Sequence, residues 1–318
     1  MGYDVSFHAI DMRMVENRVL PYIAGYGTDE DLHDLIRFGV EQTKVRFRAN
    51  AWGLGALEEL GGNADFDPQL YVWGRPYFVT AQTPDDVAET VLQYNRCTPE
   101  QVDHLAVQQL SLLDRTLVGR VRPNMEGTLP PDRYVGEAIS GKVVLLRQAV
   151  RALRARQSFT TPDGETADPG EILAGNLQFV LVEFLAHILP GWIQRGRVWP
   201  TLLERTAGSD GYSGLVDNSA LLGLMRSEFP ALEWAVNYTI PGNYEVGGYA
   251  APAAVPVTRH WLARKADELV AAGDEDDEGD VIRTAIRKTD EALALAARIG
   301  GAFVEASEIY IPMEGTMN

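Results

Sequence analysis

A polar stripe in an apolar segment holds the residues best suited to chemistry. Asn176, Glu183 and His187 lie between Glu171 and Leu189, and on a helix they would fall within about 40° of each other. Glu183 and His187 are four residues apart, so their side chains can meet. A buried carboxylate beside an imidazole shifts both titrations, as in many catalytic or metal-binding sites. We therefore predict Glu183, His187 and Asn176 as catalytic residues of an acid/base site, or the first two as ligands of a metal completed from elsewhere.

A plainer interpretation of the same stripe stays open. Glu-x-x-x-His is a weak pattern, and no second copy accompanies it. It also fits a hydrogen-bonded pair on a solvent-facing strip, or a core histidine whose hydrogen bonds are satisfied.

A second candidate is a basic helix in an otherwise acidic chain. Between Lys142 and Gln157 there is no acidic residue, and Arg147, Arg151 and Arg154 follow the spacing i, i+4 and i+7. Guanidinium groups on one face can bind a phosphate or another anion. The alternative is that this face pairs with acidic neighbours in its own fold.

Familiar catalytic and cofactor motifs are absent from the sequence. It contains no Gly-x-Ser-x-Gly, no Gly-x4-Gly-Lys-Ser/Thr and no strand-linked Gly-x-Gly-x-x-Gly. His-x-x-x-His is also absent, so a zinc protease has no support. No particular cofactor or metal is therefore indicated.

The elements expected to position these residues are mostly helices. Cap signals and apolar spacing predict helices over 84–96, 99–118, 134–157, 169–189, 217–227, 256–272 and 280–307. Before them we expect a short strand over 3–10, helices from Asp11 and Thr28, a Gly-rich and acidic stretch over 51–67 and a strand over 70–80.

The predicted fold class is therefore mostly α. We expect a multi-helix globular bundle with a small N-terminal mixed α/β segment. The segment would span 1–82 and the helical body 83–318, although one compact domain overall is also possible. Two Gly-rich, aromatic loops, at 207–214 and 241–256, have the composition of ligand-facing connections.

Composition narrows the class of protein further. The chain has 318 residues, 46% of them hydrophobic, and a formal charge of −17. Such a charge disfavours nucleic acid and anionic lipid and favours a basic partner or plain solubility. The single cysteine, Cys97, suits a reducing compartment, and no apolar stretch is long enough to cross a bilayer. We expect a soluble cytoplasmic protein that binds neither nucleic acid nor membranes; its oligomeric state is not indicated.

Three functions fit these observations. The first is an acidic binding protein, of the immunity or antitoxin kind, that engages a basic protein partner. The second is a helical-fold enzyme with a buried acid/base or metal site around Glu183 and His187, covered by the two Gly-rich loops. The third is a structural or scaffold subunit, which would show long exposed apolar helix faces.

Overall fold

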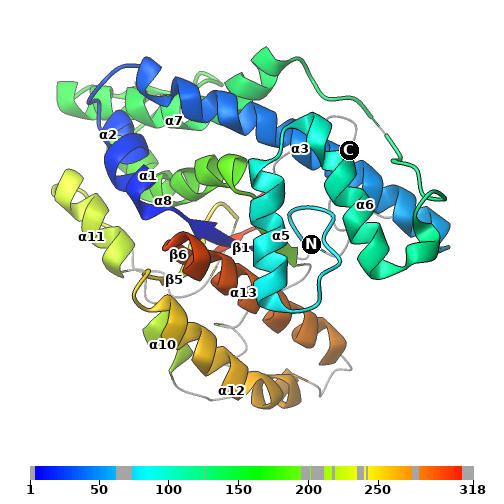
Figure 1. Cartoon of the computed structure of the whole chain (residues 1–318). Helices are drawn as coiled ribbons and strands as arrows, with labels where there is room; N and C mark the ends of the chain where they lie inside the picture. The colour runs from blue at the N-terminus through cyan, green and yellow to red at the C-terminus, as the bar shows by residue number, and fades with distance from the viewer. Residues whose placement is uncertain are drawn as a thin grey trace.

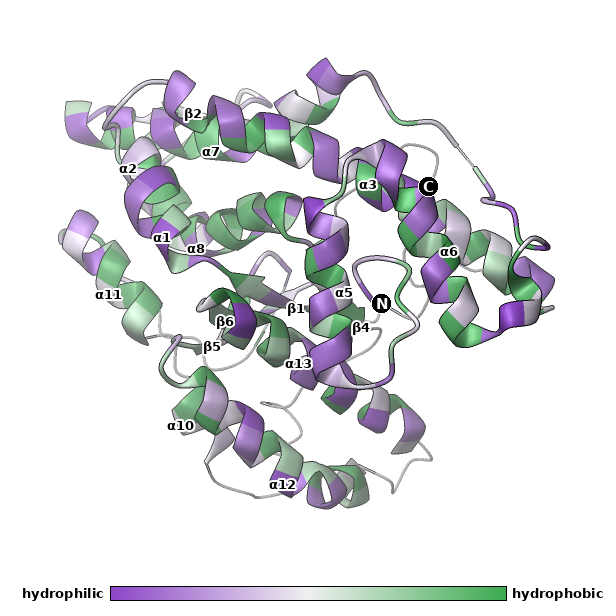
Figure 2. Ribbon diagram, viewed as in Figure 1, coloured by the Kyte–Doolittle hydropathy of each residue, from purple (hydrophilic) through white to green (hydrophobic). Residues whose placement is uncertain are grey.

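Helices surround a small antiparallel sheet in the computed structural model, which confirms a mostly α fold (Figure 1). The structure describes residues 4–61, 74–125, 127–194, 201, 211–216, 219–234, 240, 243–273 and 279–309. Hydrophilic and hydrophobic residues alternate along outer helices such as α3, α7 and α12 (Figure 2), as expected of helices that bury one face.

The sheet joins strands from distant parts of the chain. Its order is β4-β1-β6-β5 and its pairs are antiparallel, from strands β1 (Val5–Ile10), β4 (Trp192–Gln194), β5 (Val246–Ala250) and β6 (Ala302–Ser307). β1 lies between β4 and β6, and β1 and β6 are buried along their whole length. The sheet thus combines strands from both sequence ranges, 1–82 and 83–318.

The helices follow in chain order. They are α1 (Met12–Met14), the π-helical segment η1 (Val15–Val19), α2 (Leu20–Ile23), α3 (Glu30–Glu59), α5 (Pro84–Arg96), η2 (Pro99–Gln101), α6 (Val102–Leu113), η3 (Arg115–Leu117), α7 (Asp132–Ala155), α8 (Pro169–Ile188), α10 (Tyr212–Leu215), α11 (Ser219–Glu228), α12 (Val255–Gly273) and α13 (Gly279–Ile299). A two-stranded ribbon, β2 (Phe159–Thr160) with β3 (Thr166–Ala167), connects α7 to α8.

Each face of the sheet packs against its own set of helices. Alternate β1 residues Val5, Phe7 and Ala9 join a core that includes residues of α5, α6, α12 and α13. From the opposite face, Val304 of β6 joins a core with residues of α2, α7, α8 and α11. Figure 1 shows α8 and α13 on opposite sides of β1. Alternation along a strand therefore decides which helices each side chain meets.

Two predicted helix starts are confirmed by their caps. The Asp168 carboxylate accepts hydrogen bonds from the Gly170 and Glu171 amides at 2.7 and 3.1 Å, ahead of Pro169 at the first position of α8. Thr83 caps α5 in the same way, directly before Pro84. Each cap satisfies amides that the helix itself leaves unpaired.

The first part of the Gly-rich and acidic stretch over 51–67 is helical, because α3 continues to Glu59. Gly55 is required there for packing and not for a turn: a Cβ at this position would lie 1.9 Å from the carbonyl oxygen of Arg122. Residues 62–67 lie outside the described residues.

The helix expected over 280–307 is wrong in its last part. It ends at Ile299, and Gly300, with φ of +62°, turns the chain into strand β6. A left-handed glycine is the usual helix terminator, so Gly300–Gly301 carried the signal. The strand expected over 70–80 is not observed in its described part, 74–80, and 70–73 lie outside the described residues.

Candidate functional site

The predicted stripe on α8 is split among separate partners. The Asn176 amide donates to the carbonyl of Ile172 one turn earlier, at 2.8 Å. Glu183 accepts an ion-paired hydrogen bond from Lys142 of α7 at 2.7 Å, and its side chain is 16% exposed. His187 is buried. The structure therefore gives Glu183 a cationic partner on α7, and among the described residues there is no hydrogen bond between Glu183 and His187.

Two aromatic rings lie beside the Lys142 cation that Glu183 holds, although the Lys142 side chain is 47% exposed. The Lys142 ammonium lies 5.6 Å from the ring centre of Phe179 and 5.4 Å from that of Tyr244. The two rings meet edge to face, with centres 5.5 Å apart. A carboxylate with two aromatic rings is a favourable setting for an ammonium group, so the Glu183 site is already occupied by a side chain of the same protein.

His187 lies buried one turn beyond Glu183. Burial, with the nearby charges of Arg46 and Lys142, lowers the pKa of His187 to about 3. Its Nδ1 has no hydrogen-bond partner among the described residues. The ring is therefore neutral near pH 7. A neutral imidazole donates a hydrogen bond through one nitrogen and accepts one through the other, but it cannot act as a positively charged acid.

His8 on β1 is a second buried imidazole influenced by the same arginine. Burial and then the charge of Arg46 lower its pKa to about 3. Its Nε2 lies 2.8 Å from the Ser6 hydroxyl, which donates to the carbonyl of Ser307 and accepts from the Ile309 amide. Because that hydroxyl has one proton to give, His8 must carry its proton on Nε2. This bond network ties β1 to the end of β6.

The three arginines of the basic helix have different surroundings. Arg147 is buried and donates to the carbonyls of Tyr22, Tyr26 and Gly27 at the end of α2, with its guanidinium 4.3 Å from the Tyr22 ring centre. Carbonyls at a helix C-terminus attract a cation, so Arg147 has a structural role. Arg151 and Arg154 are exposed, and anion binding on this face stays a prediction.

A buried carboxylate that sequence reasoning missed lies on β6. Glu305 accepts hydrogen bonds from the hydroxyls of Thr201 and Tyr212, the latter at 2.9 Å, and none of its surface is exposed. Burial raises its pKa to about 7. The described part of the predicted loop over 207–214 thus reaches Glu305 and not Glu183. The available signal was a single acid inside the apolar run AFVEAS.

A second buried carboxylate, Glu291 of α13, was also missed. Arg75 donates to both of its oxygens, at 3.0 and 2.6 Å, and the Trp192 indole donates to one of them at 2.8 Å. One turn away, Lys288 donates to the Ile193 carbonyl at 2.8 Å. Burial lowers the pKa of Lys288 to about 8. These bonds hold α13, strand β4 and the segment around Arg75 together.

A metal site requires clustered ligand residues, and a membrane span requires a long apolar helix. They contain no group of three His, Cys, Asp or Glu side chains placed to hold a metal ion. Helix α8 is the one described helix with the length and apolar composition to cross a membrane, and 61% of the relevant window is buried inside the protein. Burial of that kind is also expected of a core helix.

Comparison with known proteins gives no relative. No family model matches the chain, and no curated protein or solved structure matches it.

The buried histidine gives a pH-dependent prediction. Unfolded, His187 has its ordinary pKa near 6.5, and folded it has a pKa of about 3. Between these values the unfolded chain binds a proton that the folded chain does not, so stability falls as the pH falls, by about 1.4 kcal/mol per pH unit for this group. We expect His187→Gln to flatten the fall in unfolding free energy between about pH 6 and about pH 4.5 by that slope, measured by urea denaturation.

His104→Gln, which removes an exposed imidazole, is the matched control and should leave the slope as in the parent protein. A parent-like slope in His187→Gln would contradict the buried, neutral state of this ring.

Proposed function

We propose that this chain is an acidic binding protein of the cytoplasm that engages a basic protein partner, in the manner of an immunity protein or antitoxin. The observation that carries the proposal is the formal charge of −17, from 45 acidic and 28 basic residues. A field of this sign attracts a basic partner, accelerates its association and repels nucleic acid.

The ion pairs of the fold support this use of the charge. Many described bases already bond to carboxylates of the same chain, including Arg18 to Asp34, Arg48 to Asp103, Arg120 to Glu59, Arg259 to Asp85 and Asp290, and Arg298 to Glu89. Because such a pair commonly takes up one acid for each base, pairing of this kind leaves an excess of acids over bases in the chain.

The start of α3 is one place where that surplus is exposed. Asp29, Glu30 and Asp31 are consecutive and exposed, and the nearby Tyr26 is 57% exposed. Asp29 accepts a hydrogen bond from the Tyr22 hydroxyl, and Asp31 accepts one from the Thr28 amide. The guanidinium of Arg154 lies 5.5 Å from the Tyr26 ring centre, so an exposed tyrosine stands here near both carboxylates and an arginine, side chains that are common in protein-binding surfaces.

Association with the partner should depend on salt and on the sign of substituted charges. Affinity capture with the full chain at low salt, about 20 mM, should retain a basic protein that about 500 mM salt releases. In stopped-flow mixing with that purified partner, the triple substitution Asp29→Asn, Glu30→Gln and Asp31→Asn should slow association and leave the fold intact.

Removing exposed bases instead of exposed acids provides the control. Substituting the exposed bases Arg115, Arg151 and Arg264 by Gln makes the chain more acidic and should speed association. The proposal fails if low salt retains no basic protein, or if the retained protein binds no better than an unrelated basic protein of similar charge.

An enzyme with its site around Glu183 and His187 is the second candidate. It is favoured by one observation, the unpartnered Nδ1 of the buried His187 one helical turn from Glu183. For Glu183 to act as a base, Lys142 would have to give up its ion pair. Glu183→Ala and His187→Ala should each abolish turnover while the circular dichroism spectrum stays that of the parent; an active variant would end this alternative.

A further inference from the structure

A small polar cavity opens between α13 and the segment that precedes α5. Its volume is about 210 Å³. Two arginines and two neutral polar residues dominate its lining, which consists of Arg75, Val79, Thr80, Gln82, Leu113 and Arg287. No carboxylate is among these described lining residues. The cavity thus combines small size with cationic walls in a strongly acidic protein.

Arg75 is a fixed part of this wall. Its side chain is 8% exposed, and three of its N–H groups donate to Glu291 and to the carbonyl of Val79. A guanidinium has five N–H groups, so two more remain to donate to a ligand. Its hydrogen bonds hold the fork in place before any ligand arrives, which reduces the entropy lost on binding.

Arg287 supplies a second positive charge, and its ion pair with Glu291 is long. Its side chain is 49% exposed, and its Nε lies 3.9 Å from a Glu291 oxygen that Arg75 already holds at 2.6 Å. Two guanidinium groups therefore share one carboxylate, which leaves the cavity with an excess of positive charge.

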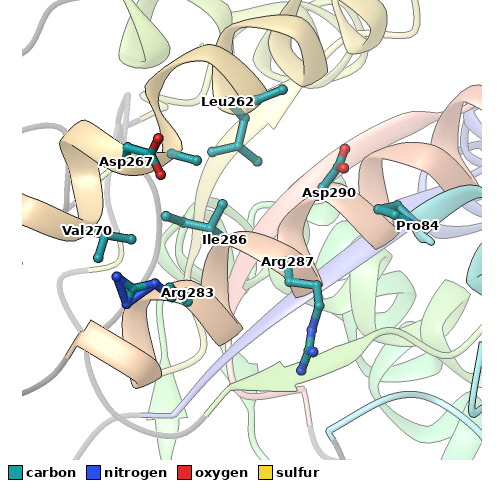
Figure 3. A pocket seen from close by; sticks show the side chains of 10 residues that line it. Pro84, Leu262, Asp267, Val270, Arg283, Ile286, Arg287 and Asp290 are labelled. Atoms are coloured by element: carbon teal, nitrogen blue, oxygen red, sulfur yellow. The ribbon is translucent and has the colours of Figure 1, made fainter. Parts of the chain in front are cut away.

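The neighbouring groove shows which way Arg287 points. The groove, of about 320 Å³, separates α12 from α13 and is largely apolar, with Leu262 and Ile286 in its lining. Figure 3 shows Arg287 directed away from those two side chains, whereas Arg283 lies beside Val270. Arg287 lines both spaces, but Arg283 lines the apolar groove and not the polar cavity.

We propose that the cavity binds a small oxyanion, a carboxylate or a phosphate group, through the guanidinium group of Arg287 and the two N–H groups of Arg75 that are not bonded to Glu291 or Val79. Forked N–H donors match the paired oxygens of both anions, and Thr80 and Gln82 offer further polar contacts in the lining. Since the net charge of −17 repels anions at long range, the affinity must come from these close contacts. This site is independent of the basic partner proposed above.

Titration of the full chain with inorganic phosphate, and separately with succinate, tests the site. Calorimetry in a cationic buffer should give saturable binding of at least one anion, and NMR should show shifts of the Arg75 and Arg287 Nε–H signals. Arg287→Met should weaken binding at least about tenfold, the loss expected for one charge-assisted hydrogen bond. The anion that binds more tightly identifies the ligand class.

Arg283→Met is the matched control, because it removes the same charge one turn earlier on α13 from a side chain that is 61% exposed. It should leave the affinity within about twofold of the parent, since distant surface charges contribute little at moderate salt. Equal losses in the two variants, or no saturable binding of either anion, would overturn the proposal.

Discussion

The buried carboxylate of Glu291 is the interaction on which the arrangement of the sheet and α13 depends. It has no exposed surface, yet it carries a charge that must be compensated inside the protein. Arg75 and Trp192 supply that compensation from two distant segments. A carboxylate stripped of such partners is strongly destabilising, so the position of α13 requires that these partners be in place.

Consequences of this contact extend across one face of the sheet. With α13 fixed, its apolar residues pack with Phe7 and Phe303 in one core, and Trp192 of the edge strand β4 is fully buried. The same bonds orient Arg75 at the cavity proposed to bind an oxyanion. The guanidinium group of Arg75 therefore has a structural role toward Glu291 and a proposed binding role in the cavity. The exposed acids serve the separate, proposed recognition of a basic partner.

Local patterns predicted much of the fold and little of the site. The cap residue Asp168 and the following Pro169 predicted the start of helix α8. The spacing of its polar residues predicted the polar stripe. Spacing also suggested a Glu183–His187 pair, but the carboxylate bonds to Lys142, 41 residues away along the chain. Arg75 and Glu291 are separated by 216 residues, and no sequence period connects them. The sequence of α13 does not distinguish Glu291 from the exposed acids of an amphipathic helix, because its burial depends on the segments that pack against it.

A double-mutant cycle on Arg75 and Glu291 tests the central role of this contact most directly. Glu291→Gln alone should lower the free energy of unfolding by about 3–5 kcal/mol, because it leaves a buried guanidinium without its counter-charge. The pair Arg75→Met with Glu291→Leu should cost clearly less than the sum of its single substitutions. A loss below about 1 kcal/mol for Glu291→Gln, typical of an exposed ion pair, would contradict the account.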